Sequence, residues 1–383
     1  MCKINLLTWY EFSKKNLLVK LMMMVVGAFL IPDLNAACRP YVEGGGTPSP
    51  IKYETISGTI SVPNDLPVGT ILYTGVNNRP QPNIGATCDS AGVFYHKQLL
   101  ETSLTQSGYV AGTPPFSHIS GSAPIYKTNV PGIGVTVNSN LTTTITTTKE
   151  CRSGEYSKCY LLPTTTANHK VLLVKIGDVS PGVINGEQIP VFRWYLGQTG
   201  QWVEVLKRIF NGQIAITVPT CRTPDVTVPM GTWQVSEFTG KGKATEWKDA
   251  SIIMNDCGQF VGYAAEHNTG YGLTTNYTPP TIKNRWELTL SPQNGTHDAV
   301  NGIINLSDGT QQSATGIGIQ LGYGSTSSAG SNLVNFNQSK SEILPTTGTR
   351  TITIPLAARY IQTKDTITPG RADGKIIFTI LYK

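Results

Sequence analysis

The chain has 383 residues, which is long for a single domain and favours two. Charged residues make up 14% of it and hydrophobic residues 39%, while 39 glycines and 24 prolines interrupt short apolar runs, a composition typical of a turn-rich, all-β protein. The formal net charge of +6 comes without a cluster of Lys and Arg interleaved with aromatic residues, so we expect no nucleic-acid partner.

The N-terminus has the pattern of a secretory signal. Lys14, Lys15 and Lys20 precede an apolar run at 21–31, and small residues follow at 34–37. The apolar run is too short to cross a bilayer, which disfavours the alternative of a membrane anchor. We therefore predict a signal peptide over residues 1–36 and an exported mature chain.

Residues 37–216 predict a first β-domain. Apolar and polar residues alternate in short segments such as 59–62, 70–73 and 171–174. Turn residues separate these segments, as at 197–200, and no helical periodicity of useful length occurs. A β-sandwich is the expected architecture.

Residues 217–383 predict a second β-domain. It begins with an expected strand pair at 225–228 and 250–254, whose two strands are joined through a glycine-rich turn. Cys221 and Cys257 enclose this pair, so a disulfide between them would lock it.

The chain ends inside a predicted strand. Ile376, Phe378, Ile380 and Tyr382 alternate along one face, and no turn or further strand follows them. A terminal strand of this kind either forms an exposed edge of an ordinary sandwich or is covered by another chain.

The C-terminal motifs resemble those of chaperone–usher pilus subunits. The resemblance rests on Gly370, fourteenth from the end, on the penultimate Tyr382, and on 316–321 and 358–370, which look like internal strands of pilin domains. It implies an incomplete immunoglobulin-like fold that lacks one strand. The implied interface residues for a periplasmic chaperone, and later for the next pilus subunit, are Gly370, Ile376, Phe378, Ile380, Tyr382 and Lys383.

A β-domain stands here where an ordinary pilus subunit carries its donor strand. That order resembles the two-domain tip adhesins of chaperone–usher fimbriae, and 126–135 and 209–219 look like parts of their lectin domains. The resemblance implies export through the periplasm and an outer-membrane usher to the fimbrium tip at the cell surface. It also implies binding of host or surface glycans. The alternative is a structural pilus subunit whose extra domain is a spacer or a protein-binding module.

Six cysteines remain after the predicted signal. The spacings suggest sequential pairing, with Cys151 to Cys159 and Cys221 to Cys257, although sequence leaves other connectivities open. The family resemblance matches Cys38 and Cys88 to the first disulfide of the lectin domain. We expect neither a metal site nor a cofactor, because no CxxC motif occurs and the five histidines are scattered.

The chain carries no GxSxG, HExxH, Walker or GxGxxG motif, and we expect it not to be an enzyme. Sugar recognition instead needs amides, carboxylates and hydroxyls beside an aromatic face. Two loops supply them. The predicted tip-site residues are Asp89, Ser90, Tyr95, Gln198, Thr199, Gln201 and Trp202.

A flank site is the alternative position for the sugar. Mannose-binding relatives begin with Phe-Ala-Cys, whereas this chain has Ala36 and Ala37 before Cys38, so mannose specificity is not carried over. Other relatives bind N-acetylglucosamine or galactose on the flank of the domain. The polar candidates there are Asn77, Asn78, His118 and Asn129.

Overall fold

The computed structural model is all-β, as the composition predicts. It describes residues 38–42, 47, 50–78, 84–88, 92–138, 146–151, 159–161, 169–198, 201–270, 276–307 and 312–383. These ranges contain 26 strands and three single-turn 3-10 helices, and no α-helix. None of their helices is long or apolar enough to cross a membrane. The predicted signal peptide lies outside the described residues.

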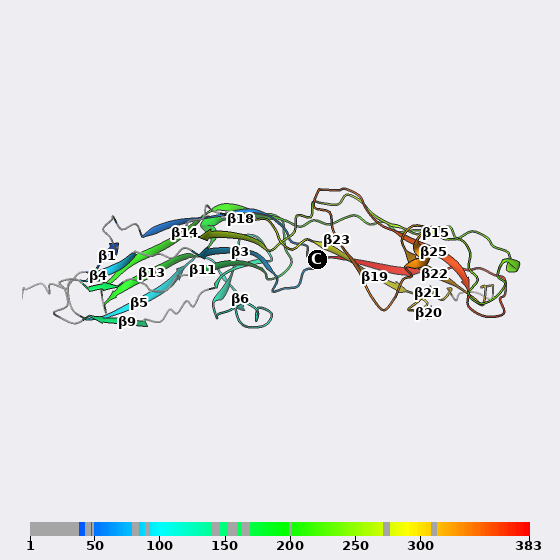
Figure 1. The fold of residues 1–383 in the computed structure, drawn as a ribbon, viewed down its shortest axis with the longest axis horizontal. Coiled ribbons are helices and arrows are strands. Elements are labelled where there is room, and N and C mark those ends of the chain that lie inside the picture. Colours follow the sequence, from blue (N-terminus) through cyan, green and yellow to red (C-terminus); the bar gives the residue numbers. More distant parts are fainter. Residues whose placement is uncertain are drawn as a thin grey trace, which may run out of the picture.

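The first sandwich is built from one seven-stranded and one six-stranded sheet (Figure 1). The seven-stranded sheet has the order β18-β17-β3-β11-β8-β7-β6. Its strands are β3 (Ile71–Asn78), β6 (Gln106–Val110), β7 (Pro124–Lys127), β8 (Ile133–Asn138), β11 (His169–Lys175), β17 (Ala265–Gly270) and β18 (Asn276–Thr278).

The six-stranded sheet has the order β12-β14-β13-β5-β9, with β2 pairing in parallel beside β14. Its strands are β2 (Ile51–Ser61), β5 (Gly92–Glu101), β9 (Thr146–Cys151), β12 (Gly182–Asn185), β13 (Val191–Gln198) and β14 (Gln201–Thr217). A small third sheet consists of β1 (Cys38–Val42), β4 (Ile84–Cys88) and β10 (Cys159–Leu161), and the 3-10 turn η1 covers Gly186–Gln188.

The core of the first sandwich lies between these sheets. Ile60 from β2, Leu72 from β3, Val135 from β8 and Ile214 from β14 are fully buried in one cluster. They come from strands whose apolar residues alternate with polar ones, so one face of each strand is apolar and packs inward.

The second sandwich has three short sheets, ordered β15-β25-β22-β21-β20, β16-β24 and β23-β19-β26. The strands are β15 (Lys248–Asp249), β16 (Ile252–Met254), β19 (Arg285–Pro292), β20 (Thr296–Asp298), β21 (Ile303–Ile304), β22 (Ile317–Tyr323), β23 (Lys340–Ile343), β24 (Ile352–Ile354), β25 (Leu356–Gln362) and β26 (Ile376–Tyr382). The 3-10 turns η2 and η3 cover Val235–Glu237 and Ala329–Ser331.

One predicted strand of this domain is not formed. Residues 225–228 pair with no strand in the described chain, and β16 pairs with β24 instead. The prediction of a strand pair between 225–228 and 250–254 is therefore wrong. Val228 packs on the core whereas Val226 is exposed, so the two residues do not form one buried face, and a strand also needs a backbone partner.

A hairpin formed by β17 and β18 connects the two halves of the molecule. β17 and β18 fall within the predicted second domain, yet β17 pairs in parallel with β3 and extends the first sheet. The Ala264 N–H also donates to the Leu72 carbonyl at 2.8 Å. The hairpin thus lies after the predicted boundary at residue 217 but belongs to a sheet of the first sandwich. Figure 1 shows the two sandwiches end to end, with the C-terminus between them.

Buried polar groups complete this junction. Ser61 and Asn284 are both fully buried. The Asn284 side-chain amide accepts from Gly262 N–H at 2.9 Å and donates to the Ser61 carbonyl at 3.3 Å, while the Ser61 hydroxyl accepts from Val261 N–H at 2.9 Å. Because buried polar groups need partners, these bonds hold the two halves in one arrangement.

Candidate functional site

The last strand, β26, lies at the edge of its sheet, as predicted. It pairs with β19 on one side, and no described strand pairs with its other side. Ile376, Phe378 and Ile380 are only half-buried, although they pack on the core cluster of the second sandwich. Ile377, between them, is 51% exposed on the opposite face.

Residues 223–238 lie against the same core without forming a ladder. Val228, Met230, Trp233 and Phe238 are half-buried on the core cluster that also carries the half-buried face of β26. An incompletely covered apolar face therefore has the edge of β26 on one side and an unpaired segment on the other.

A cleft of about 440 Å³ lies where this segment meets the chain before β26. Trp233 and Phe238 line it from the segment, and Tyr360 lines it from β25. Gly370 also lines the cleft, and a Cβ atom at this position would lie 2.4 Å from the Gln312 carbonyl oxygen, so no larger residue fits. The predicted interface residue Gly370 is thus placed at one end of the incompletely covered face.

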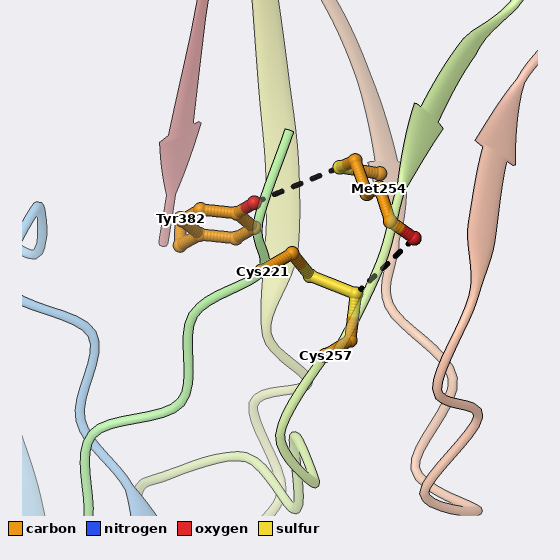
Figure 2. The surroundings of a disulfide bond; sticks show 4 residues. All are labelled: Cys221, Met254, Cys257 and Tyr382. Atoms are coloured by element: carbon orange, nitrogen blue, oxygen red, sulfur yellow. Dashed lines mark hydrogen bonds between the residues drawn. A yellow bond between two sulfur atoms is a disulfide. The ribbon is translucent and has the colours of Figure 1, made fainter. Parts of the chain in front are cut away.

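The other end of this face is fixed by the disulfide between Cys221 and Cys257, which confirms that predicted pair (Figure 2). Beside it, the Tyr382 hydroxyl donates to the Met254 sulfur at 3.6 Å, and the Tyr382 ring stacks on Phe260. Burial raises the pKa of the Tyr382 phenol, so it stays neutral at physiological pH. Lys383, the last residue, pairs with Glu287 at 2.7 Å.

Three cysteines of the first half, Cys38, Cys88 and Cys159, lie on the small sheet, and Cys151 ends β9 of the six-stranded sheet. Cys38 is disulfide-bonded, and it stands directly opposite Cys88, its predicted partner, in the β1–β4 register. Cys159 on β10 stands opposite Cys88 from the other side. The predicted pairing of Cys151 with Cys159 falls on side chains outside the described set, and it stays a prediction.

A cation lies between two aromatic rings on the outer face of the six-stranded sheet. The Lys97 Nζ atom is 5.5 Å from the Tyr195 ring centroid and 5.4 Å from the Trp202 ring centroid. These side chains come from three adjacent strands, β5, β13 and β14, whose register brings them together. Tyr95, opposite Gly197, lies on the same face by the alternation of β5.

Charged groups continue this face. Arg193 donates to Glu101 at 2.5 Å and to Glu204 at 2.6 Å. Burial of the Tyr195 phenol is the main cause that raises its pKa, and a hydrogen bond with Glu204 raises it further. The face thus offers aromatic rings, carboxylates and hydrogen-bond donors side by side, and we call Tyr95, Lys97, Arg193, Tyr195, Trp202 and Glu204 the aromatic–charged face.

The predicted tip-site residues divide between this face and other places. Trp202 and Tyr95 belong to the aromatic–charged face. Gln201, one residue before Trp202, points to the other side of β14, and its Oε1 atom is buried without a hydrogen-bond partner. Asp89, Ser90 and Thr199 lie outside the described residues, as does the side chain of Gln198.

Of the four flank candidates, the structure describes the side chains of Asn129 and His118. The Asn129 side-chain amide donates to the Val183 carbonyl at 2.9 Å, which gives it a role in holding β12. His118 is exposed on a turn between β6 and β7. Asn77 and Asn78 end β3, and their side chains are not described.

The sequence analysis missed Lys97, Arg193, Tyr195 and Glu204. The alternation of residues along β5 and β13 is the sequence pattern that could have indicated them. Placing them beside Trp202 also requires the pairing register of β5, β13 and β14 and the irregularity between Trp194 and Tyr195. No group of three or more His, Cys, Asp or Glu side chains in the described ranges could hold a metal ion.

The C-terminal part matches a known family. Residues 209–383 match the model of the family described as fimbrial protein. Over 338 residues, 85% of this chain and 89% of the relative, the sequence is 24% identical to a fimbria adhesin protein of Klebsiella pneumoniae.

Two solved structures cover both halves of the chain at low similarity. The CupB6 tip adhesin of Pseudomonas aeruginosa is 13% identical with a TM-score of 0.33, and the likeness covers 90% of this chain and 93% of that one. The CsuC–CsuE chaperone–tip adhesion subunit pre-assembly complex of Acinetobacter baumannii is 12% identical with a TM-score of 0.24, covering 90% and 100%.

The family match spans all of β19 to β26, the disulfide and the incompletely covered face. The chain is thus a two-domain, all-β protein whose residues 209–383 are similar to the fimbrial protein family.

Proposed function

We propose that this chain is the tip adhesin of a chaperone–usher fimbria, which binds carbohydrate through its first domain. The fimbrial domain comes second, and a β-sandwich precedes it where a fibre-building subunit would hold a strand to donate. A subunit that accepts a strand and has none to give stands at the end of a fibre. The similarity to a fimbria adhesin protein over 85% of the chain supports this position.

The second domain joins the fibre by accepting a strand from another chain. The free edge of β26 and its half-buried residues support this assignment. A periplasmic chaperone occupies that edge during export, and the next subunit occupies it after assembly at the outer-membrane usher. The protein therefore lies at the cell surface, at the tip of the fimbrium.

The aromatic–charged face is the observation that supports carbohydrate binding most. Pyranose rings stack on aromatic side chains, and their hydroxyls bond to carboxylates, amides and guanidinium groups. Trp202 and Tyr195 supply rings, while Glu204 and Arg193 supply an acceptor and a donor beside them. We place the sugar on this face, and the predicted tip-site residues Asp89, Ser90 and Thr199, which lie outside the described residues, stay part of the proposal.

A glycan array tests the proposal. The full mature chain is used, with a synthetic donor strand tethered after Lys383 to cover β26, because the hairpin of β17 and β18 ties the two halves together. We expect binding to a defined set of glycans. Binding to proteins but to no glycan would favour the alternative, a structural subunit whose extra domain is a spacer or a protein-binding module.

Two substitutions then locate the sugar. Asp89→Ala should weaken glycan binding by at least about tenfold, because a carboxylate makes charge-assisted bonds worth roughly 1.5–3 kcal/mol each to sugar hydroxyls. Asn129→Ala should leave the affinity unchanged. The opposite pattern would place the site on the flank.

A further inference from the structure

Two reciprocal bonds fix which backbone groups of β26 face its free edge. Arg285 N–H donates to the Lys383 carbonyl at 2.6 Å, and Lys383 N–H donates to the Arg285 carbonyl at 2.8 Å. Bonded and non-bonded pairs alternate along an antiparallel pair, so β19 bonds the odd-numbered residues of β26. The N–H and C=O groups of Phe378, Ile380 and Tyr382 therefore point to the free edge.

At one of these three positions the edge is already occupied. The Tyr382 N–H donates to the Asp65 carboxylate of the first domain at 2.8 Å, across a sequence separation of 317 residues. The edge-facing N–H of Tyr382 therefore has a charged acceptor, and hydrogen bonds to charged acceptors are stronger than those between neutral groups. The described chain offers no such side chain to Phe378 or Ile380.

Asp65 is held in place by its own turn. It lies between β2 and β3, where the Leu66 N–H donates to the Pro63 carbonyl at 3.3 Å. The neighbouring Asn64 side chain accepts from Val179 N–H at 2.6 Å and ties the turn to the loop after β11. Lys175, which is 2% exposed, lies close enough to Asp65 and Asp178 to interact with both charges.

We propose that the first domain forms one end of the strand-accepting site, with Asp65 as a stop that ends the incoming strand. The strand comes from a second protein chain and pairs with Phe378 and Ile380. It does not pair with Tyr382, because a backbone carbonyl that approached this N–H would meet the carboxylate oxygen already there. Asp65 thus sets both the register and the length of the strand that this chain accepts.

A tethered strand tests the stop. The full chain is extended after Lys383 by a flexible linker and a synthetic strand of alternating apolar residues, which folds back antiparallel along β26. A short version reaches the backbone groups of Ile380 and Phe378. A long version adds two residues at the linker end, so that it also reaches Tyr382. Each is made in the natural chain, in Asp65→Ala, in Asp65→Asn and in Asp178→Ala.

The melting temperature should be the same for short and long strands in the natural chain and in Asp178→Ala. In Asp65→Ala the long strand should raise it by about 2–4 °C, the gain expected for one added backbone hydrogen bond in a domain of this size. Asp178→Ala is the matched control, since it removes an equal charge near Lys175 without touching β26. An equal gain from the long strand in the natural chain would overturn the proposal.

Amide exchange gives a second readout on the short-strand proteins, labelled with ¹⁵N-tyrosine. The Tyr382 amide should exchange slowly in the natural chain and in Asp65→Asn, which keeps an oxygen acceptor, and at least tenfold faster in Asp65→Ala. Equal exchange rates in the natural chain and Asp65→Ala would show that the carboxylate does not occupy this N–H, and the proposal would fail.

Discussion

At the scale of single residues, the sequence predicts the Trp202 side chain of the aromatic–charged face but not its neighbour Lys97. Trp202 was predicted as an apolar wall for a sugar from its place after a turn, and it does lie on an outer face. Lys97 was not predicted, although its Nζ atom lies between the Trp202 and Tyr195 rings. Sequence cannot supply this contact, because it depends on which residues of β5 and β13 face one another.

Substituting Trp202 tests the aromatic–charged face directly. Trp202→Ala should weaken glycan binding at least about tenfold, since stacking and the burial of a large ring are both lost. Tyr53→Ala is the matched control, because Tyr53 is 68% exposed on β2 of the same sheet and lies outside this face. Affinity is measured by titration with the glycan found on the array, and equal losses in both variants would contradict the assignment.

At the scale of elements, the last strand and the disulfide were predictable, whereas 225–228 was not. The alternation of Ile376 to Tyr382 predicts β26, and two enclosed cysteines predict their pair. Alternation alone cannot tell whether a segment has a backbone partner. Residues 225–228 have the pattern of a strand, but no described strand lies beside them to form a ladder.

The two faces of β26 should respond differently to charge. Phe378→Asp places a carboxylate against the core and under the accepted strand, at a cost of several kcal/mol, so incorporation into fimbriae should fall sharply. Ile377→Asp, one residue away but 51% exposed, should be incorporated normally. Immunoblots of purified fimbriae measure both, and glycan binding by the first domain should persist in each; normal incorporation of Phe378→Asp would refute the role of this strand.

At the scale of the whole molecule, a hairpin from the second half of the sequence extends a sheet of the first sandwich. Composition and chain length predict two β-domains, but not that β17 and β18 return to the first sheet. A parallel pair between strands so far apart in sequence leaves no local pattern, and the polar groups that seal the junction, Ser61 and Asn284, are ordinary residues until their burial is known.

Removing the Asn284 side chain should loosen this junction. Asn284→Ala leaves the buried Gly262 N–H without its acceptor, which should lower the free energy of unfolding by about 1–3 kcal/mol. Asn305→Ala, where the asparagine is exposed, should change it by less than about 0.5 kcal/mol. Denaturant melts of the strand-tethered chain measure both values, and equal stabilities would mean that the polar junction contributes nothing.

The position of the protein on the fibre tests the tip-adhesin account most directly. Antibodies against residues 92–138 of the first domain, coupled to gold particles, are applied to fimbriated cells and imaged by electron microscopy. A chain that accepts a strand and donates none should label only the free ends of fimbriae. Label distributed along the shafts would mean that the chain is built into the fibre, and would contradict its assignment as the tip adhesin.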